Sequence, residues 1–254
     1  MVSIDFKAVI RLERAMLNSW PSLSVLHEHD WIVRLADGYT KRANSVTCLG
    51  ADDSALEQRI ERVETIYTDR GLPTIFRLSP LASPALETML ADRGWRRFDE
   101  TIVLSANLVD LLQQATSAVS HDVTIAPEPD QAWLEGCDRI DSSTSKHLIT
   151  LRAMLERLVP PAGFGRINGK DGIDAQALVV VDADCAGIFD VLTTPRRRQQ
   201  GLARQLLTRL FAWSATKGAK IAWLSVLADN QAAVQLYRSL GFSERYRYHH
   251  RCND

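Results

Sequence analysis

Hydrophobic positions in the second half of the chain recur with the periods of helices and strands. Residues 144–158 carry four leucines spaced three or four positions apart, which is the spacing of one helix face. A second such face begins at Leu202, and we expect its helix to end at Gly218, because glycine commonly terminates helices. The pattern predicts helices at 130–141, 144–158, 202–217 and 231–240, and strands at 123–125, 163–167 (an edge strand), 177–181, 187–192, 221–226 and 245–251.

The first half shows a shorter version of the same alternation. We expect helices at 6–19 and 56–70, and a last strand at 101–105. The turn pair Asp37-Gly38 predicts a hairpin that joins strands at 31–35 and 42–47. Residues 113–120 are small and polar, so they are the expected linker between the halves.

An internal repeat connects the two halves. The segment from Arg70 aligns without a gap with the segment from Lys217, at an offset of 147 residues. Glycines and aromatic residues coincide in this alignment: Gly71 with Gly218, Phe76 with Trp223, Gly94 with Gly241 and Trp95 with Phe242. We therefore expect two related α/β modules in tandem, at residues 1–118 and 119–254.

Composition narrows the class of protein. The chain has 254 residues, of which 46% are hydrophobic, so a packed core is expected. The formal net charge of −1 does not favour binding to nucleic acid or acidic membranes. No apolar run is long enough for a membrane span or a secretory signal. The four cysteines are scattered without metal-ligand spacing, which favours reduced thiols in a cytoplasmic protein and no metal site.

A loop between a predicted strand and a predicted helix has the chemistry of an anion site. The sequence Thr193–Ala203 leads from the strand at 187–192 into the helix that begins at Leu202. Unpaired backbone N–H groups converge at a helix N-terminus, and the helix dipole adds about +0.5 charge there. Gly201 permits close approach of a phosphate, and three arginines at 196–198 add donors. An ordinary loop with a solvated arginine run is the alternative.

Residues farther along the chain favour the anion site. Asn230, Tyr237 and the run Leu240-Gly241-Phe242 follow the loop after one helix and one strand. Together with Arg198–Ala203, these motifs resemble the Gcn5-related N-acetyltransferase (GNAT) superfamily, whose acetyl-coenzyme A loop and C-terminal signature they match. The order of predicted elements from Val123 to Arg251 is also similar to that fold. The resemblance implies two tandem GNAT-like modules, each with a mixed, mostly antiparallel sheet flanked by helices.

The resemblance implies acetyl-coenzyme A as co-substrate and a direct attack by a primary amine in a ternary complex. It assigns to this co-substrate Val191, Leu192, Thr193, Arg196, Arg197, Arg198, Gln199, Gln200, Gly201, Leu202, Ala203, Asn230 and Tyr237. Backbone N–H groups of residues 190–193 would stabilise the oxyanion, and Tyr237 would protonate the departing thiolate. Core packing of Tyr237 and simple helix capping by Asn230 are the alternative roles.

The general base is less well defined by the sequence. Asp190 is expected on the same strand face as Ile188 and Leu192, and a carboxylate on an apolar strand points to function. A structural aspartate is the alternative. His147 is a second candidate, whereas His249 and His250 are expected to be solvated.

The first module lacks the equivalent loop. Subtracting 147 from 198–203 gives residues 51–56, where Asp52 and Asp53 stand in place of a glycine-rich turn. Leu90 replaces Tyr237 at the same offset. Since two carboxylates would repel a pyrophosphate, we expect this module to be degenerate. Its aromatic and basic group Trp31, Arg34, Tyr39, Arg42 and Asn44 either lines a substrate surface or belongs to an ordinary hairpin.

Three functions remain open at this point. The first is an N-acyltransferase that acts on a small-molecule or peptide amine, as a monomer or homodimer. The second is a non-catalytic acyl-coenzyme A sensor. The third, a nucleic-acid-binding protein, is disfavoured because the arginine run stands alone in a chain of balanced charge.

Overall fold

The computed structural model describes residues 4–114, 121–140 and 142–253, so most of the expected linker lies outside the described residues. The elements of the first half are α1 (Phe6–Ser19), β1 (Ser24–Glu28), β2 (Trp31–Leu35), β3 (Val46–Cys48), α2 (Leu56–Thr68), β4 (Ile75–Leu78), α3 (Pro84–Asp92), β5 (Arg96–Asn107) and α4 (Leu108–Gln113). Those of the second half are β6 (Val123–Ala126), α5 (Gln131–Ile140), α6 (Leu148–Leu155), β7 (Ala162–Gly169), β8 (Gly172–Asp182), β9 (Cys185–Thr193), α7 (Leu202–Thr216), β10 (Ile221–Leu227), α8 (Gln231–Ser239) and β11 (Ser243–Cys252).

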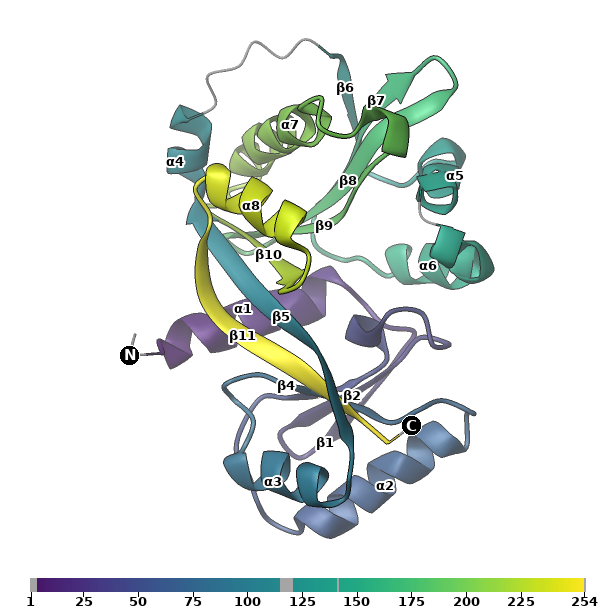
Figure 1. Ribbon diagram of the computed structural model, residues 1–254, viewed down its shortest axis with the longest axis vertical. Helices are drawn as coiled ribbons and strands as arrows, with labels where there is room; N and C mark the ends of the chain where they lie inside the picture. The colour runs from purple at the N-terminus through teal and green to yellow at the C-terminus, as the bar shows by residue number, and fades with distance from the viewer. Residues whose placement is uncertain (1–3, 115–120, 141, 254) are drawn as a thin grey trace.

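The described residues form one continuous sheet of eleven strands in the order β1-β2-β3-β4-β11-β5-β10-β9-β8-β7-β6. Only the pairs β3–β4 and β9–β10 are parallel, so the sheet is mixed and mostly antiparallel, as expected. When the residue numbers of α3 are increased by 147, both ends coincide with those of α8. The same shift places β4 inside β10. Figure 1 shows a lower lobe from the first half and an upper lobe from the second.

The two halves exchange their last strands. By the repeat, β5 corresponds to β11, so a self-contained second half would pair β10 with β11. Instead β10 pairs with β5 from Ile221↔Asn107 to Leu227↔Thr101, and β11 pairs with β4 of the first half. The two long strands also pair with each other and run from one lobe to the other (Figure 1). The halves therefore share their central strands, and the 1–118 and 119–254 division remains a prediction about sequence units.

Helices cover both faces of the shared sheet. One core cluster lies between β5, β8, β9 and β10 and the helices α4, α7 and α8. A second cluster lies on the opposite face of the second half, beneath α5, α6 and also α1. Because α1 belongs to the first half, this packing joins the halves a second time; Asn18 Nδ2 donates to Asp182 Oδ2 at 2.9 Å. A third cluster fills the first half beneath α2 and α3.

A buried ion pair occupies the junction of the halves. Glu13 of α1 and Arg77 of β4 are 0% and 1% exposed, and Arg77 Nη2 donates to Glu13 Oε1 at 2.9 Å. Burial is the largest single influence and lowers the pKa of Arg77, but the interactions with Glu13, Tyr248 and Tyr246 together outweigh it, and the net pKa is raised. Tyr246 of β11 completes the group by donating its hydroxyl to Glu13 Oε1 at 2.6 Å. Residues of three elements, α1, β4 and β11, thus meet in this buried group.

We expect Tyr246→Phe to lower the free energy of unfolding by about 2 kcal/mol, because a hydrogen bond to a buried charged group is lost. Urea denaturation monitored by fluorescence measures the difference. Tyr248→Phe is the matched control, because that ring packs beneath the Arg77 guanidinium at 3.7 Å and keeps this contact in the variant. Equal stability of Y246F and wild type would show that the hydroxyl does not contribute to the junction.

The structure corrects several expected elements. The strand expected at 42–47 begins only at Val46, because Asn44 binds the preceding loop: its Oδ1 accepts from Ala36 N at 2.7 Å and its Nδ2 donates to Tyr39 O at 2.7 Å. Residues 41–43 form a 3-10 turn instead. The expected edge strand 163–167 is internal, because β6 pairs beyond β7. The expected helix 144–158 starts as a 3-10 segment up to His147, and β1 and α4 were not predicted.

Candidate active site

The site lies where β9 and β10 separate. These strands pair only from Cys185↔Ile221 to Gly187↔Trp223, whereas β9 stays paired with β8 as far as Thr193. Residue 187, in the last of these pairs, is a glycine. A Cβ at this position would lie only 2.7 Å from Trp223 Cζ2, so a larger residue would not fit. Beyond it the strands no longer bond to each other, so backbone groups of β9 face an opening.

A bulge in β9 turns the backbone at this opening. Gln176 pairs with Leu192 but Leu178 pairs with Phe189, so β9 holds one extra residue. Asp190 has φ +47°, a left-handed conformation that is uncommon for a residue other than glycine. The expected alternation of Ile188, Asp190 and Leu192 on one face is therefore wrong, since the bulge interrupts the period of two.

The larger of two adjoining cavities, which we name the loop cavity, has a volume of about 710 Å³. It lies between β9, the loop after it, α7 and α8. Of the residues expected to bind the co-substrate, eleven line it: Val191, Leu192, Thr193, Arg197, Arg198, Gln199, Gly201, Leu202, Ala203, Asn230 and Tyr237. Gly201 precedes α7 with φ +78°, and no side chain caps the helix. The first N–H groups of α7 are therefore available to a ligand.

The arginine run does not act as one group. Arg196 does not line the loop cavity; its Nη1 donates to Asp171 Oδ2 at 2.8 Å. Gln200 is also outside the cavity lining, and its Nε2 donates to the Arg196 carbonyl at 3.1 Å. Arg197 pairs with Asp174, with 3.2 Å between Nε and Oδ2. Arg198 lines the cavity, and its Nε is 3.4 Å from the Thr193 carbonyl. Among the described residues, Arg198 is thus the arginine of this run that lines the cavity without an ion pair to a carboxylate.

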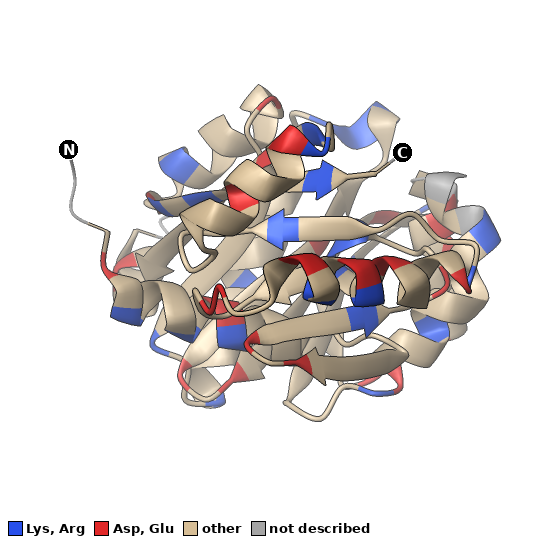
Figure 2. Ribbon diagram, turned by 90° about the horizontal axis from the view of Figure 1, so that it is seen from below, with Lys and Arg blue, Asp and Glu red and all other residues tan. Residues whose placement is uncertain are grey.

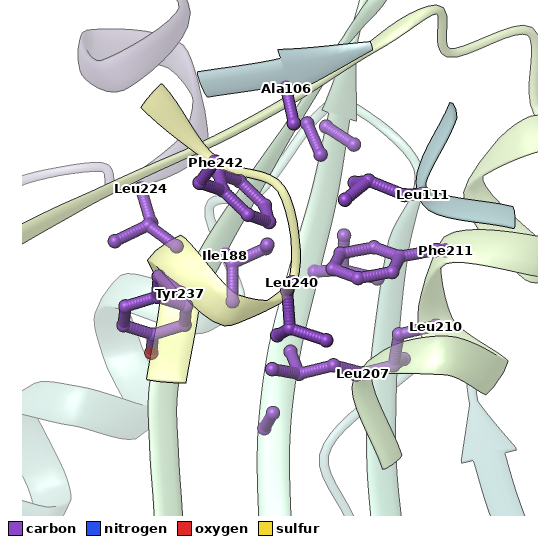
Figure 3. Close-up of a cluster of buried hydrophobic side chains, with 14 of the residues drawn as sticks. Ala106, Leu111, Ile188, Leu207, Leu210, Phe211, Leu224, Tyr237, Leu240 and Phe242 are labelled. Atoms are coloured by element: carbon purple, nitrogen blue, oxygen red, sulfur yellow. The ribbon is translucent and has the colours of Figure 1, made fainter. Parts of the chain in front are cut away.

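Asn230 immediately precedes α8 and Tyr237 lies in its last turn, and both side chains line the cavities. The ring of Tyr237 packs edge-on to Phe242, with centroids 6.0 Å apart, and its oxygen lies at the margin of the apolar cluster (Figure 3). The side chain is 7% exposed, and burial raises its pKa to about 12. Asn230 caps α8, since its Oδ1 accepts from Ala233 N at 3.2 Å, and it also lines the loop cavity. Capping and cavity lining coexist in this residue.

A small cavity of about 190 Å³, the junction cavity, continues from the loop cavity into the gap between the strands. Val191, Asn230, Ala233 and Tyr237 line both cavities. Asp190 lines the junction cavity with Tyr237, so the two expected catalytic residues meet there. Burial, and secondly the charge of Asp190, raises the pKa of Tyr39 of the first half.

A third cavity of about 670 Å³, the outer cavity, shares Arg42, Ser225 and Leu227 with the junction cavity. Its remaining lining residues are Gly38, Tyr39, Thr40, Lys41, Asp99, Thr101, Lys146, His147, Tyr248 and His250. Tyr39 and Arg42 of the aromatic and basic group thus face a cavity. The other three members do not: Trp31 is in the first-half core, Arg34 bonds to backbone carbonyls, and Asn44 holds its loop.

The histidines differ in environment. His147 lines the outer cavity and its ring lies 5.2 Å from that of Tyr39. His249 is half-buried, with its Nε2 3.1 Å from Glu87 Oε2. The expectation that His250 is solvated is wrong: it is 3% exposed, because the exchanged strand β11 lies in the middle of the sheet. Burial, with the nearby cations Arg77 and Lys41, lowers the pKa of His250 to about 3.

In the first half, side chains of the protein itself bind backbone groups of the corresponding loop, residues 51–56. Asp52 Oδ1 accepts from Ser54 N at 2.9 Å, and Asp30 Oδ2 accepts from Asp52 N at 3.0 Å. Arg59 Nη1 then donates to the Asp52 carbonyl at 2.6 Å. Carboxylates of Asp30 and Asp52 thus bind two backbone N–H groups within this loop, whereas α2 itself, like α7, has no side-chain cap.

Charge on the surface is mixed. In the view of Figure 2, lysine and arginine segments alternate with aspartate and glutamate segments over the visible elements. Within the described ranges, no group of three or more His, Cys, Asp or Glu side chains is arranged to hold a metal ion. No helix in these same ranges has the length and apolar character needed to span a membrane.

Comparisons with known proteins agree with this architecture. The uncharacterized N-acetyltransferase YobR of Bacillus subtilis is 27% identical over 95% of this chain and 97% of its own length. A GCN5-related N-acetyltransferase from Kribbella flavida matches with a TM-score of 0.68 and 18% identity, over 99% of this chain and 96% of that chain. A tandem GNAT protein from the clavulanic acid biosynthesis pathway matches with a TM-score of 0.63 and 11% identity, over 82% and 74%.

Fold and site therefore define an acyltransferase of the GNAT class. Residues 7–252 match a single family model, so the chain belongs to the family described as "Probable histone acetyltransferase Rv0428c C-terminal".

Proposed function

We propose that this protein transfers an acetyl group from acetyl-coenzyme A to a primary amine by direct attack in a ternary complex. The observation that carries the proposal is the connection of the loop cavity to the junction cavity at Tyr237 and Val191. The pyrophosphate would bind the first N–H groups of α7 and Arg198. The thioester would then reach the gap between β9 and β10.

The reaction needs three contributions from the chain. The amine nitrogen bonds to the carbonyl carbon, the carbon–sulfur bond breaks, and one proton leaves the amine while the thiolate gains one. Backbone N–H groups at the β9 bulge would stabilise the developing oxyanion. Tyr237 remains protonated at neutral pH because burial raises its pKa to about 12, so it can donate a hydrogen bond to the sulfur as charge develops.

Asp190 is the proposed general base. It lines the junction cavity, and the bulge holds it in a left-handed conformation of the kind that is often found at active sites. We expect Asp190→Asn to lower kcat/KM for the amine by about tenfold at neutral pH, because the amine must then lose its proton to water. The defect should shrink as the pH approaches the pKa of the amine. A constant defect across the pH range would instead assign Asp190 a structural role.

The test of the function combines binding and turnover. Acetyl-coenzyme A should raise the melting temperature, and a panel of amines should produce free thiol, measured with a thiol-reactive chromophore. Stabilisation without thiol release from any amine would favour the sensor; neither effect would reject the loop cavity as the binding site.

A further inference from the structure

The outer cavity is built by both halves of the chain. The first half contributes the loop 38–42 and the residues Asp99 and Thr101 of β5. The second half contributes Lys146, His147 and the β11 residues Tyr248 and His250. The cavity adjoins the junction cavity through Arg42, so a molecule in it can place a nitrogen beside Asp190.

Positive charge exceeds negative charge along this cavity. Lys41 forms an ion pair with Asp99, which is the one carboxylate in the cavity lining. Among the residues the structure describes, no carboxylate lies within ion-pair distance of Arg42 or Lys146. The Arg42 guanidinium instead lies against two aromatic rings, 5.3 Å from the centroid of Trp20 and 5.6 Å from that of Phe189. These rings position the guanidinium and leave its donors for a ligand.

His250 adds a buried polar group without a partner. Neither ring nitrogen has a hydrogen-bond partner in the described structure, although the residue is 3% exposed and lines the outer cavity. An unpaired buried polar group is costly, so a ligand that enters the outer cavity and bonds to His250 would gain from relieving this cost. The neutral imidazole offers one N–H donor and one acceptor.

We propose that the amine acceptor is a small amine that also carries an anionic carboxylate or phosphate, which Arg42 binds in the outer cavity with a hydrogen bond from His250. The nitrogen then lies in the junction cavity beside Asp190. The anionic group of the acceptor thus faces the cation Arg42, and its amine faces the carboxylate of Asp190. Polyamines and lysine-rich peptides fit this arrangement poorly, since Arg42 and Lys146 repel them. The proposal rests on the acetyltransferase function above.

Matched pairs of acceptors test the proposal. Each free amino acid is compared with its C-terminal amide, which removes the carboxylate, and O-phosphoethanolamine is compared with ethanolamine, which removes the phosphate. The rate of thiol release from acetyl-coenzyme A gives kcat/KM. We expect one anionic member to exceed its neutral partner by about 10-fold to 100-fold, the range for a charge-assisted hydrogen bond. The pair that shows this difference identifies whether the acceptor's anion is a carboxylate or a phosphate.

Variants of Arg42 connect the preference to this residue. Arg42→Gln should reduce the ratio of anionic to neutral acceptor to near 1 by raising KM for the anion, and Arg42→Lys should retain part of the ratio. The matched control is Arg14→Gln, an exposed arginine of α1 that lines none of the three cavities. His250→Phe should raise KM for the anionic acceptor several-fold.

The outcomes separate this proposal from the function on which it rests. If neutral or cationic amines are the best acceptors, or if R42Q keeps the wild-type ratio, the anionic acceptor is rejected while the acetyltransferase stands. If acetyl-coenzyme A neither stabilises the protein nor loses its acetyl group to any amine, both are rejected.

Discussion

Gly201→Asp should abolish the stabilisation of the protein by acetyl-coenzyme A. A carboxylate about 5 Å from the pyrophosphate would cost about 3 kcal/mol at an effective dielectric constant of about 20, which lowers affinity more than 100-fold. The new side chain itself meets no obstacle, because a Cβ on Gly201 has no neighbour within 4 Å. Differential scanning fluorimetry with and without acetyl-coenzyme A measures the effect.

Gly201→Ala is the control for the backbone. Both variants place a side chain at φ +78° and share a strain of about 1 kcal/mol, but only one adds charge. The first half shows that the conformation is accessible, since Ala55 precedes α2 with φ +49°. If alanine and aspartate lower the thermal shift equally, strain rather than charge controls binding; if aspartate binds like wild type, the phosphates lie elsewhere.

Tyr237→Phe should lower kcat by about 100-fold and leave the affinity for acetyl-coenzyme A nearly unchanged, because proton donation acts in the transition state. The ring contact with Phe242 remains in the variant, and among the described residues none forms a hydrogen bond with the hydroxyl that would be lost. Folding stability should therefore change little. Steady-state thiol release gives kcat, and isothermal titration calorimetry gives the affinity.

The opposite pattern would assign Tyr237 to packing. A variant with wild-type kcat, or one whose loss lies wholly in a higher dissociation constant for acetyl-coenzyme A, contradicts the acid role. Phe242→Leu serves as a packing control, since it alters the neighbour of Tyr237 and keeps the hydroxyl (Figure 3).

Periodicity located most helices well, because their apolar faces are local signals. The prediction for α1 matches both ends, and Asp5 explains its start by accepting from Lys7 N at 3.0 Å. The β7 strand and the β3 boundary were predicted less well, because edge position and strand pairing depend on distant partners. The turn around Asn44 depends on five backbone groups that only the folded loop brings together.

Some parts of the candidate site were likewise predictable from the sequence and others were not. Motif spacing located the residues of the loop cavity, since a strand, a loop and a helix adjacent in sequence build it. It did not place Arg196 and Gln200, because their positions follow from the ion pair with Asp171. It also missed the burial of His250, which is visible only once β11 lies between β4 and β5.

The sequence by itself determined the repeated unit, the position of the loop that lines the loop cavity and the absence of the same motif from the first half. Each of these depends on residues close together in the chain, whose backbone preferences and charges act locally. Only the tertiary structure decided the exchange of β5 and β11 and the outer cavity that it builds. The contacts that accompany this exchange, such as the bond between Tyr246 and Glu13, join residues 233 positions apart, which no local pattern in the sequence relates.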